Sequence, residues 1–247
     1  NLLSSLFHRG PNDKLTMLRE YKLTYEHEWF SGFLNRIHLV HQEIFPLGST
    51  EFIIYPNGRQ DPQYMNSIFT SEITIDTRFS FRERFLAAEF ERLTISSVYP
   101  IIQLSYTHGF PDIFNSDFEY NKLILNVSQW FHFASIGWSK YIIESGKIWG
   151  TLPYPLLRIH DGNQTFFYDD YSSNLMNYYE FVSDLWISAS FTHHFAGLLF
   201  NKIPLVRKLK WREVAHVRAV YGTLASENAE YSRFPGNLRS FARQPYY

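Results

Sequence analysis

The residues best suited to chemistry are charged side chains at alternate positions of two extended segments. The segment 20–29 places three glutamates and a lysine on one face, and 72–82 places two acidic residues and two arginines on one face. Paired carboxylates can act as general acid and base. Carboxylates two residues apart on a strand that faces water are more often solvated charges, so we expect them to pair with arginine and lysine across an interior. The side chains expected to face this water-filled interior are Glu20, Lys22, Glu26, Glu28, Asp76, Arg78 and Arg82.

The histidines and hydroxyl residues form no recognisable metal or nucleophile site. His193 and His194 are adjacent, so on a strand their side chains point to opposite faces and cannot bind one metal ion. The sequence has no HExxH helix and no cysteine, and no GxSxG, Walker or GxGxxG element follows a strand. We therefore expect no metal, no other cofactor and no enzymatic activity.

A long connection at 151–180 holds the best candidate binding residues. It reads HDGNQ and then the aromatic and acidic run FFYDDY. Asp-Gly and Gly-Asn pairs indicate tight turns. The run could contact the interior as a plug, bind a partner, or hold a cation at Asp169 and Asp170; we favour a loop that folds into the interior and packs its aromatic rings there. The candidate binding residues are His160, Asp161, Phe167, Tyr168, Asp169 and Asp170.

A basic cluster with one aromatic residue follows near the C-terminal end. It comprises Arg207, Lys208, Lys210, Trp211 and Arg212. Nucleic-acid binding needs more positive charge than this, and the whole chain carries a net charge of −1. We favour an anchor at a membrane interface, where lysine and arginine reach the headgroups and tryptophan lies among them. The alternative is a docking patch for a periplasmic partner.

The composition of the 247 residues narrows the protein class. Aromatic residues make up 19% and charged residues 19%, against roughly 25% charged in an average soluble domain. The absence of cysteine excludes disulfide scaffolds and thiolate chemistry. No apolar run approaches the roughly 20 residues of a membrane helix, but a transmembrane barrel can be polar on average.

Alternation of polar and apolar residues dominates the chain and predicts strands. We expect eight of them, near 15–30, 34–45, 68–84, 92–108, 118–132, 138–150, 181–195 and 210–223. Several exceed the usual strand length of about 5 or 6 residues. Their apolar faces are expected to contact lipid, for example through Leu23, Tyr25, Ile75, Phe79, Ile187 and Phe191. An arginine at Ile75 should then cost about 2–4 kcal/mol, and one at Ser80, on the opposite face, should cost little.

The connections alternate between short and long ones. The short set is 31–33, 85–91, 133–137 and 196–209, and the long set is 46–67, 109–117, 151–180 and 224 onward. Short turns at one end and long loops at the other are typical of bacterial outer-membrane barrels. We therefore predict an all-β, antiparallel up-and-down transmembrane β-barrel, as one domain over 1–247. A soluble antiparallel sandwich would show the same alternation and stays the alternative.

Several segments resemble a known family. They are PYPLLRIHDGNQTFFYDDYSSNLMNYYEFVSD (153–184), EWFSGFLNRIHLVHQEIFPLG (28–48), ESGKIWGTLPYP (144–155) and, most specifically, FNKIPLVRKLKWREV (200–214). They are similar to the barrel of a Bacteroidetes outer-membrane family of unknown function with an N-terminal carboxypeptidase-regulatory-like domain, and more loosely to outer-membrane assembly-factor barrels. Family members have an amino-terminal domain and further strands outside this sequence, so we expect a fragment of a larger barrel.

The resemblance implies a role in transport, or in assembly and export of outer-membrane proteins, within a complex of proteins. It implies the bacterial outer membrane as location and membrane lipid or lipopolysaccharide as contacts, with no nucleic acid. Two other hypotheses stay open: a soluble or periplasmic β-sandwich that binds a ligand, and an outer-membrane hydrolase with a serine and a histidine near its rim.

Overall fold

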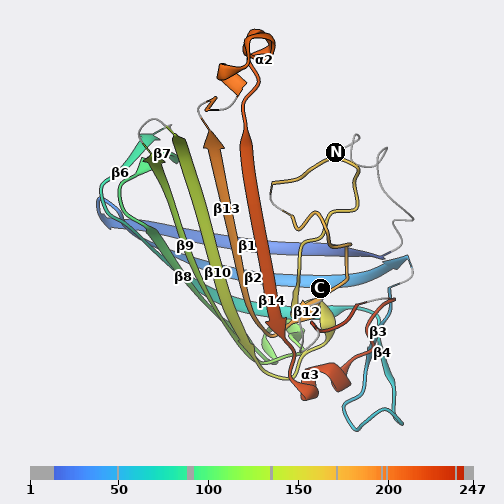
Figure 1. The fold of residues 1–247 in the computed structure, drawn as a ribbon. Helices are drawn as coiled ribbons and strands as arrows, with labels where there is room; N and C mark the ends of the chain where they lie inside the picture. The colour runs from blue at the N-terminus through green and yellow to red at the C-terminus, as the bar shows by residue number, and fades with distance from the viewer. Residues whose placement is uncertain are drawn as a thin grey trace.

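The computed structural model describes residues 14–48, 50–87, 92–133, 136–170, 172–195, 197–198, 200–236 and 238–241. Most of them belong to one large antiparallel sheet (Figure 1). Its strands are β1 (Lys14–Phe30), β2 (Phe33–Gly48), β5 (Ile68–Ser80), β8 (Ile101–Phe110), β9 (Tyr120–Phe133), β10 (Gly137–Trp149), β13 (Leu185–Phe195) and β14 (Val214–Thr223). They lie in the order in which they occur in the chain, each antiparallel to the next. The predicted mostly-β meander of eight long strands is confirmed.

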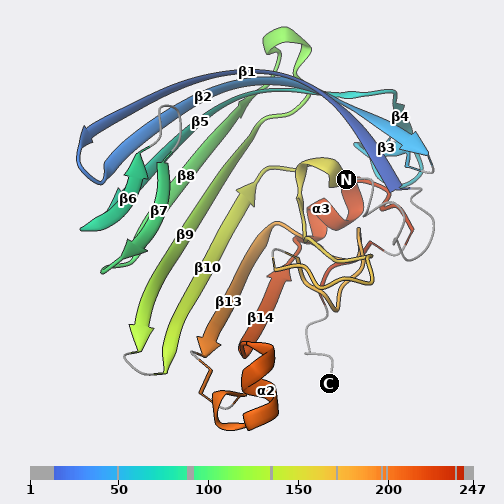
Figure 2. The same ribbon diagram turned by 90° about the horizontal axis from the view of Figure 1, so that it is seen from above.

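The sheet curves into a trough and does not close into a barrel (Figure 2). Among the described residues, β1 pairs with β2 and β14 pairs with β13, and no pairing joins β1 to β14. The prediction of a barrel therefore holds only in its coarser form, as an open, curved, up-and-down sheet. The trough has a convex outer face and a concave face, and the long loops gather against the concave face (Figure 2).

Three predicted strands are each divided in two: 181–195 divides into β12 (Val182–Ser183) and β13, and two others are split at a bend. The segment 68–84 divides into β5 and β6 (Glu83–Ala87), and 92–108 divides into β7 (Arg92–Ser97) and β8. β6 and β7 pair with each other as a separate hairpin. Arg82 has a φ of 52°, which extended backbone does not adopt, so β5 ends before it. The placement of Arg82 on the charged face of this strand was wrong, because it lies in the bend with its guanidinium over the Phe81 ring.

The connection from β13 to β14 is longer than predicted and partly helical. It contains the 3₁₀ turn η3 (Phe200–Lys202) and the short helix α2 (Pro204–Leu209), and β14 begins at Val214. Pro204 at the first helical position suits a helix start because its missing N–H needs no partner there. This connection extends beyond the sheet as a projection (Figure 1).

The long connections form short elements of their own. These are β3 (Phe52–Ile54), β4 (Gln63–Met65), the 3₁₀ turns η1 (Ile113–Asn115) and η2 (Tyr154–Leu156), β11 (Arg158–Ile159), β12 (Val182–Ser183) and the helix α3 (Ser226–Tyr231). β3 pairs with β4, and β11 pairs with β12. All of them lie at the end of the sheet where the long connections join the main strands, which we call the long-loop end; the opposite end is the short-turn end.

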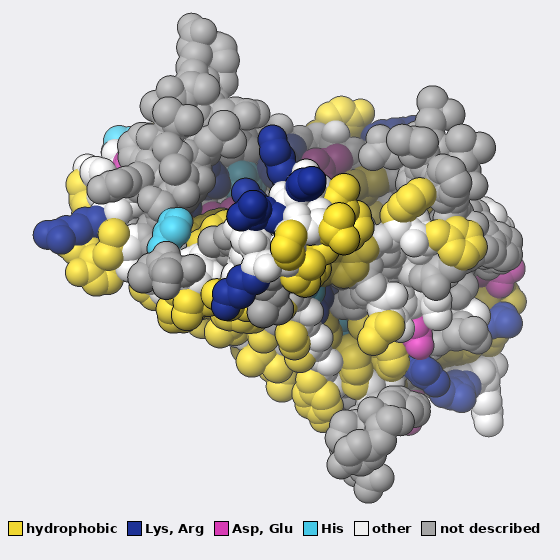
Figure 3. Space-filling view, turned by 45° about the horizontal axis from the view of Figure 1, so that its top comes forward, with side chains coloured by type: hydrophobic (Ala, Val, Ile, Leu, Met, Phe, Trp, Pro, Cys, Tyr) yellow, Lys and Arg dark blue, Asp and Glu magenta, His cyan; other side chains and the backbone are white. Residues whose placement is uncertain are grey.

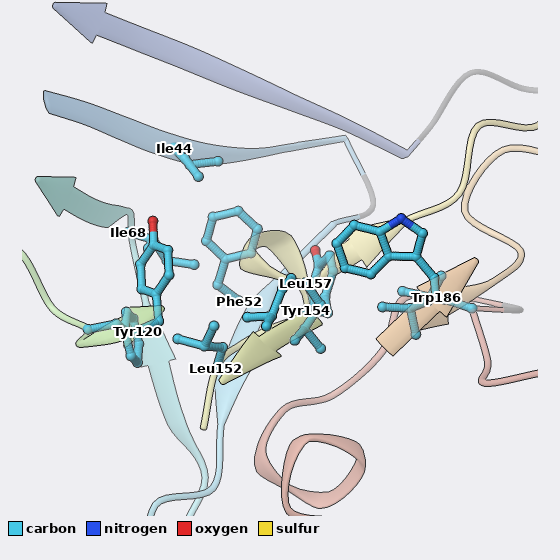
Figure 4. Close-up of a cluster of buried hydrophobic side chains, with 12 residues drawn as sticks. Ile44, Phe52, Ile68, Tyr120, Leu152, Tyr154, Leu157 and Trp186 are labelled. Atoms are coloured by element: carbon cyan, nitrogen blue, oxygen red, sulfur yellow. The ribbon is translucent and has the colours of Figure 1, made fainter. Parts of the chain in front are cut away.

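These loops and the concave face of the sheet enclose the largest hydrophobic cluster (Figure 4). Leu152, Tyr154 and Val182 are almost fully buried in it. The other members are Ile44, Phe52, Ile68, Phe118, Tyr120, Ile148, Leu157, Trp186 and Leu238. Hydrophobic burial therefore covers one end of the trough, and the rest of the concave face carries many polar and charged side chains.

Polar side chains fix the loops over this cluster. The buried Asn228 of α3 accepts a hydrogen bond from the Leu152 amide at 2.9 Å and donates one to Asp184 at 3.1 Å. Asp184 also accepts from the Ala225 amide and pairs with Lys147 at 3.2 Å. A buried carboxylate is costly unless it is paired and hydrogen-bonded, and Asp184 meets both conditions. At the start of β13, it joins the connection after β14 to strand β10.

Candidate functional site

The two faces of the sheet differ in chemistry on every main strand. Side chains at odd positions of β1, β2, β5, β9, β10, β13 and β14, and at even positions of β8, share the convex face, because cross-strand partners lie on the same side. The large hydrophobic residues exposed there include Tyr21, Leu23, Tyr25, Ile37, Leu39, Ile75, Phe79, Ile102, Leu104, Tyr106, Leu125, Ile143, Leu185, Ile187, Phe191, Val217 and Tyr221. Hydrophobic side chains form a broad patch over the sheet (Figure 3).

This apolar face is open rather than packed. Tyr25 is 62% exposed, Phe79 42% and Phe191 41%. A soluble sandwich would cover such a face with a second layer, and isolated exposed patches on soluble monomers rarely exceed a few hundred Å². The described residues provide no layer over this face (Figure 2).

Hydrogen-bonded polar side chains border the convex apolar band at its two ends. At the long-loop end, Asn121 accepts hydrogen bonds from Tyr106 and pairs with His108. At the short-turn end of the same strand, Gln129 donates to the Val98 carbonyl and accepts from Tyr141. About eight residues separate the two, roughly 26 Å of strand. Strands of an outer-membrane barrel are tilted by about 35–45°, so this stretch would rise roughly 20 Å, which is most of the apolar band of about 25 Å that such a barrel carries.

The same pattern recurs on other strands of the convex face. In β2, His41 hydrogen-bonds Ser71 at 3.0 Å near the long loops, and Asn35 donates to Thr77 at 2.8 Å near the short turn. Trp29 donates its indole N–H to Asn35 at 2.9 Å. Tryptophan with its polar group at the band's edge is typical of a membrane interface.

A groove interrupts the convex face at the long-loop rim. Its volume is about 750 Å³, and its walls include Tyr21, Leu39, Ile73 and Phe114. Phe114 belongs to η1 and has a φ of 50°, and the nearby Asp112 and Asn115 also have positive φ angles of 61° and 63°. Such backbone costs on the order of 1 kcal/mol per residue. It places the Phe114 ring edge-on to His41 at 5.5 Å, so η1 extends the apolar face beyond the strand ends.

The concave face of β1, β2 and β5 carries a row of polar contacts. His38 lies between Thr24 and Asp76: its Nδ1 is 2.9 Å from the Thr24 hydroxyl and its Nε2 is 3.0 Å from the Asp76 carboxylate. At the next concave position of β1 and β2, Glu26 and Arg36 form an ion pair. Charged residues therefore sit opposite each other across strands, which stabilises pairing.

The structure places Glu20, Lys22, Glu26, Glu28, Asp76 and Arg78 on this concave face, at even positions of β1 and β5. Their partners differ in part from those expected from sequence. Arg78 forms a two-pronged ion pair with Glu83 at 2.7 and 2.9 Å instead of a pair with β1. Glu28 accepts a hydrogen bond from the Gly32 amide and so closes the β1–β2 turn.

Glu72 marks the boundary between the polar wall and the hydrophobic cluster. Its Oε1 accepts hydrogen bonds from Gln42 at 3.1 Å, from Thr70 at 3.2 Å and from the Tyr120 hydroxyl. A carboxylate with three donors is well compensated for partial burial. Neither Tyr120 nor this junction was expected from sequence, because the donors come from three different strands.

The loop that contains the candidate binding residues folds against the concave face, but its aromatic run is largely exposed. Phe166, Phe167 and Tyr168 are 73%, 61% and 60% exposed. The expected packing of these rings was wrong, because Leu152, Tyr154 and Leu157 from the start of the loop fill the cluster instead. Asn163 shapes the aromatic turn by donating to the Phe167 carbonyl at 2.7 Å.

His160 is buried and cannot serve as an exposed ligand. Its Nε2 lies 2.6 Å from the Ser183 hydroxyl. Burial, together with the positive charges of Arg158 and Arg218, lowers the pKa of His160 to about 4. Asp161, by contrast, is exposed and lies 3.4 Å from Arg158. The two neighbours therefore do not act at one site.

Asp169 and Asp170 lie beyond the aromatic turn, close to β14. The Tyr168 ring lies edge-on to His216 of β14 at 5.8 Å. The pKa of Tyr168 is raised by partial burial and by the carboxylates of Asp170 and Asp169, against the opposing charge of Arg218. This end of the loop thus meets charged residues of the sheet that sequence reasoning had not connected to it.

The basic cluster lies at the opposite end of the sheet from the hydrophobic cluster. Arg207, Lys208, Lys210, Trp211 and Arg212 are all exposed, on α2 and the turn after it. Exposed Leu205 and Leu209 lie in the same helix. Cationic and apolar side chains side by side at the edge of an apolar face suit an interface between water and lipid.

The paired histidines lie on opposite faces of β13. On the convex side, the His193 Nδ1 is 2.7 Å from the hydroxyl of Ser139, which is fully buried. On the concave side, His194 stacks on Trp138 at 3.9 Å. Within the described residues, three or more His, Asp or Glu side chains nowhere gather closely enough to hold a metal ion. In the same residues no helix is both long and apolar enough to cross a bilayer.

Comparison with known families identifies the domain. Residues 4–232 match the C-terminal domain of a family of unknown function, DUF5686. The chain belongs to this family. This confirms the resemblance to a family of unknown function, and leaves the outer-membrane and barrel parts of it as proposals. No curated protein matches the sequence.

Proposed function

We propose that this DUF5686 C-terminal domain is a membrane-embedded segment of an outer-membrane β-barrel wall, with a non-enzymatic role in transport or in assembly and export of outer-membrane proteins. The observation that carries the proposal is the convex face, on which each of the eight main strands carries exposed apolar side chains. In water that face would be an aggregation hazard, whereas in lipid it is the favoured surface.

The edges of the sheet support a larger assembly. In hydrocarbon, each unsatisfied backbone N–H or C=O costs several kcal/mol, so open sheet edges do not persist there. Among the described residues, the outer edges of β1 and β14 pair with no other strand. The proposal therefore requires strands from elsewhere in the protein, or a partner chain, to cover both edges.

The concave face supports a conduit or a scaffold in preference to an enzyme. Its polar wall contains cross-strand ion pairs. The serines of three Ser–His pairs, Ser71, Ser139 and Ser183, are buried and closed to a substrate. The loop cluster covers only one end of the trough. On this proposal the convex face contacts membrane lipid and lipopolysaccharide in the bacterial outer membrane, and protein partners complete the complex.

Fractionation of the native protein tests the membrane assignment. Cells are broken, membranes are washed with alkaline carbonate, and the pellet is extracted with Triton X-114, with a known periplasmic protein as the matched control. The DUF5686 protein should stay in the membrane pellet during the carbonate wash. On extraction of that pellet with Triton X-114, it should enter the detergent phase. Release into the aqueous phase with the control would refute the membrane role and favour the periplasmic binding module.

Depletion separates the two roles. If the domain serves assembly or export, depletion should lower the amounts of several other outer-membrane proteins, measured by quantitative mass spectrometry of purified outer membranes. If it serves transport, those amounts should stay constant while uptake of a solute falls. If full depletion causes neither of these changes, both roles are contradicted.

A further inference from the structure

A second cavity lies on the concave side, where the loop 168–176 meets β14. Its volume is about 290 Å³. The polar walls include Ser172 from the loop and His216 and Arg218 from successive concave positions of β14. Met176 and Val220 supply apolar walls. The cavity is distinct from the convex face on which the proposed membrane role rests.

Two polar atoms of this cavity are buried and have no hydrogen-bond partner among the described residues. They are the Ser172 hydroxyl oxygen and the His216 Nε2. Ser172 itself is more than nine-tenths buried. An unsatisfied buried polar group costs about 1–3 kcal/mol, and most such groups in proteins have a partner. Two in the same small cavity indicate that a polar ligand belongs there.

The orientation of His216 is fixed from behind. Its Nδ1 lies 2.8 Å from the Thr192 hydroxyl, a group that can donate or accept. When the Thr192 hydroxyl donates to Nδ1, the neutral imidazole carries its proton on Nε2. A ligand oxygen at Nε2 would accept this hydrogen bond, and the Ser172 hydroxyl would donate a second one.

The charges around the cavity limit the negative charge of the ligand that it can hold. The Arg218 guanidinium lines the cavity and supplies positive charge. The carboxylates of Asp169 and Asp170 lie close enough to Tyr168 to raise its pKa. They would repel a doubly charged phosphate more strongly than a singly charged carboxylate.

We propose that this cavity binds the carboxylate of a small organic acid or of a peptide C-terminus. Ser172, His216 and Arg218 hold the carboxylate, and Met176 and Val220 contact a short apolar group attached to it. The site couples the long loop to β14, so its occupancy would hold the loop against the sheet.

Calorimetric titration of the detergent-solubilised full-length protein tests this site. Butyrate is the probe, butyramide is its uncharged match, and inorganic phosphate is the doubly charged comparison. Butyrate should bind saturably and at least tenfold more tightly than either of the others. A parallel titration with N-acetyl-dialanine and its C-terminal amide shows whether the cavity also binds the C-terminal carboxylate of a peptide.

Variants locate the binding. Ser172→Ala and His216→Leu should each weaken butyrate binding at least tenfold, whereas His132→Leu, at an exposed concave position of β9, should leave it unchanged. Ser172→Ala removes only a hydroxyl, so it carries the test if His216→Leu fails to fold. Absence of saturable butyrate binding, equal binding of butyramide, tighter binding of phosphate, or unchanged affinity in Ser172→Ala would each overturn the proposal. Because the protein is in detergent, the result does not depend on whether the convex face contacts lipid.

Discussion

Replacing Ile75 by arginine gives the sharpest test of the convex face. Ile75 lies in the middle of β5, between Ile37 and Tyr106 on the neighbouring strands, and is 42% exposed. In lipid, arginine near the midplane of a barrel wall costs about 2–4 kcal/mol. In water, the same change at a part-exposed position would stay within about 0.5 kcal/mol. The two environments therefore predict effects that differ several-fold.

The control must lie at the same depth on the opposite face. Ser80 does not serve, although the sequence suggested it, because it is 2% exposed and accepts a hydrogen bond from Arg78. Ser105 of β8 lies on the concave face directly across from Asp76, so an arginine there faces a carboxylate. We expect Ser105→Arg to change stability by less than about 1 kcal/mol.

Urea unfolding of the full-length protein in phosphatidylcholine vesicles, followed by tryptophan fluorescence, provides the measurement. Midpoints and slopes of the parent, Ile75→Arg and Ser105→Arg give the free energies of unfolding. A loss confined to Ile75→Arg supports lipid contact. Equal losses in the two variants, or none in Ile75→Arg, would show that the assignment of the faces is wrong.

Three further predictions concern the loop-covered end of the trough. Leu152→Ala should lower the free energy of unfolding by about 2–5 kcal/mol, because Leu152 is fully buried in the cluster; a loss below 1 kcal/mol in urea titrations would argue against that packing. Gly146→Ala should lower the melting temperature and alter tryptophan emission, because the added methyl carbon would come within 2.2 Å of the Trp186 ring; unchanged emission would contradict this contact. Burial lowers the pKa of His160 to about 4, so the unfolded state binds more protons than the folded state between about pH 6.5 and 4. The free energy of unfolding should therefore fall by about 2 kcal/mol from pH 7 to pH 5. An equal fall in His160→Gln would show that another group causes the pH dependence.

Strand positions were predictable because the alternation of side chains between the two faces of a sheet depends only on residues that are near one another in the sequence. Alternation alone places Tyr25 and Ile75 on one face and Glu26 and Asp76 on the other, and the observed register agrees. The short turn at 31–33 follows from its length and from Gly32, whose φ of 93° suits glycine. These features need only neighbouring residues for their explanation.

The loop cluster was not predictable because its contacts join distant parts of the chain. The backbone amides of Leu152 and Tyr154 donate hydrogen bonds to the side chains of Asn228 and Ser232, more than 70 residues away. The aromatic run at 166–168 has the composition of a buried segment, yet Asn163 turns it outward through side-chain hydrogen bonds. The cavity at His216 likewise required knowledge of where the 151–180 loop returns to the sheet.

The hydrophobic cluster gives the open sheet a means of keeping its curvature. In a closed barrel, pairing of the first and last strands fixes the radius. Here Ile44 of β2 and Ile68 of β5 share one cluster with Ile148 of β10 and Trp186 of β13, so the loops connect the two sides of the trough across its concave face. The edges of β1 and β14 then keep a defined separation without pairing to each other. A sheet held in this way presents two preformed edges for strand addition, which is the arrangement that a barrel completed by other strands requires.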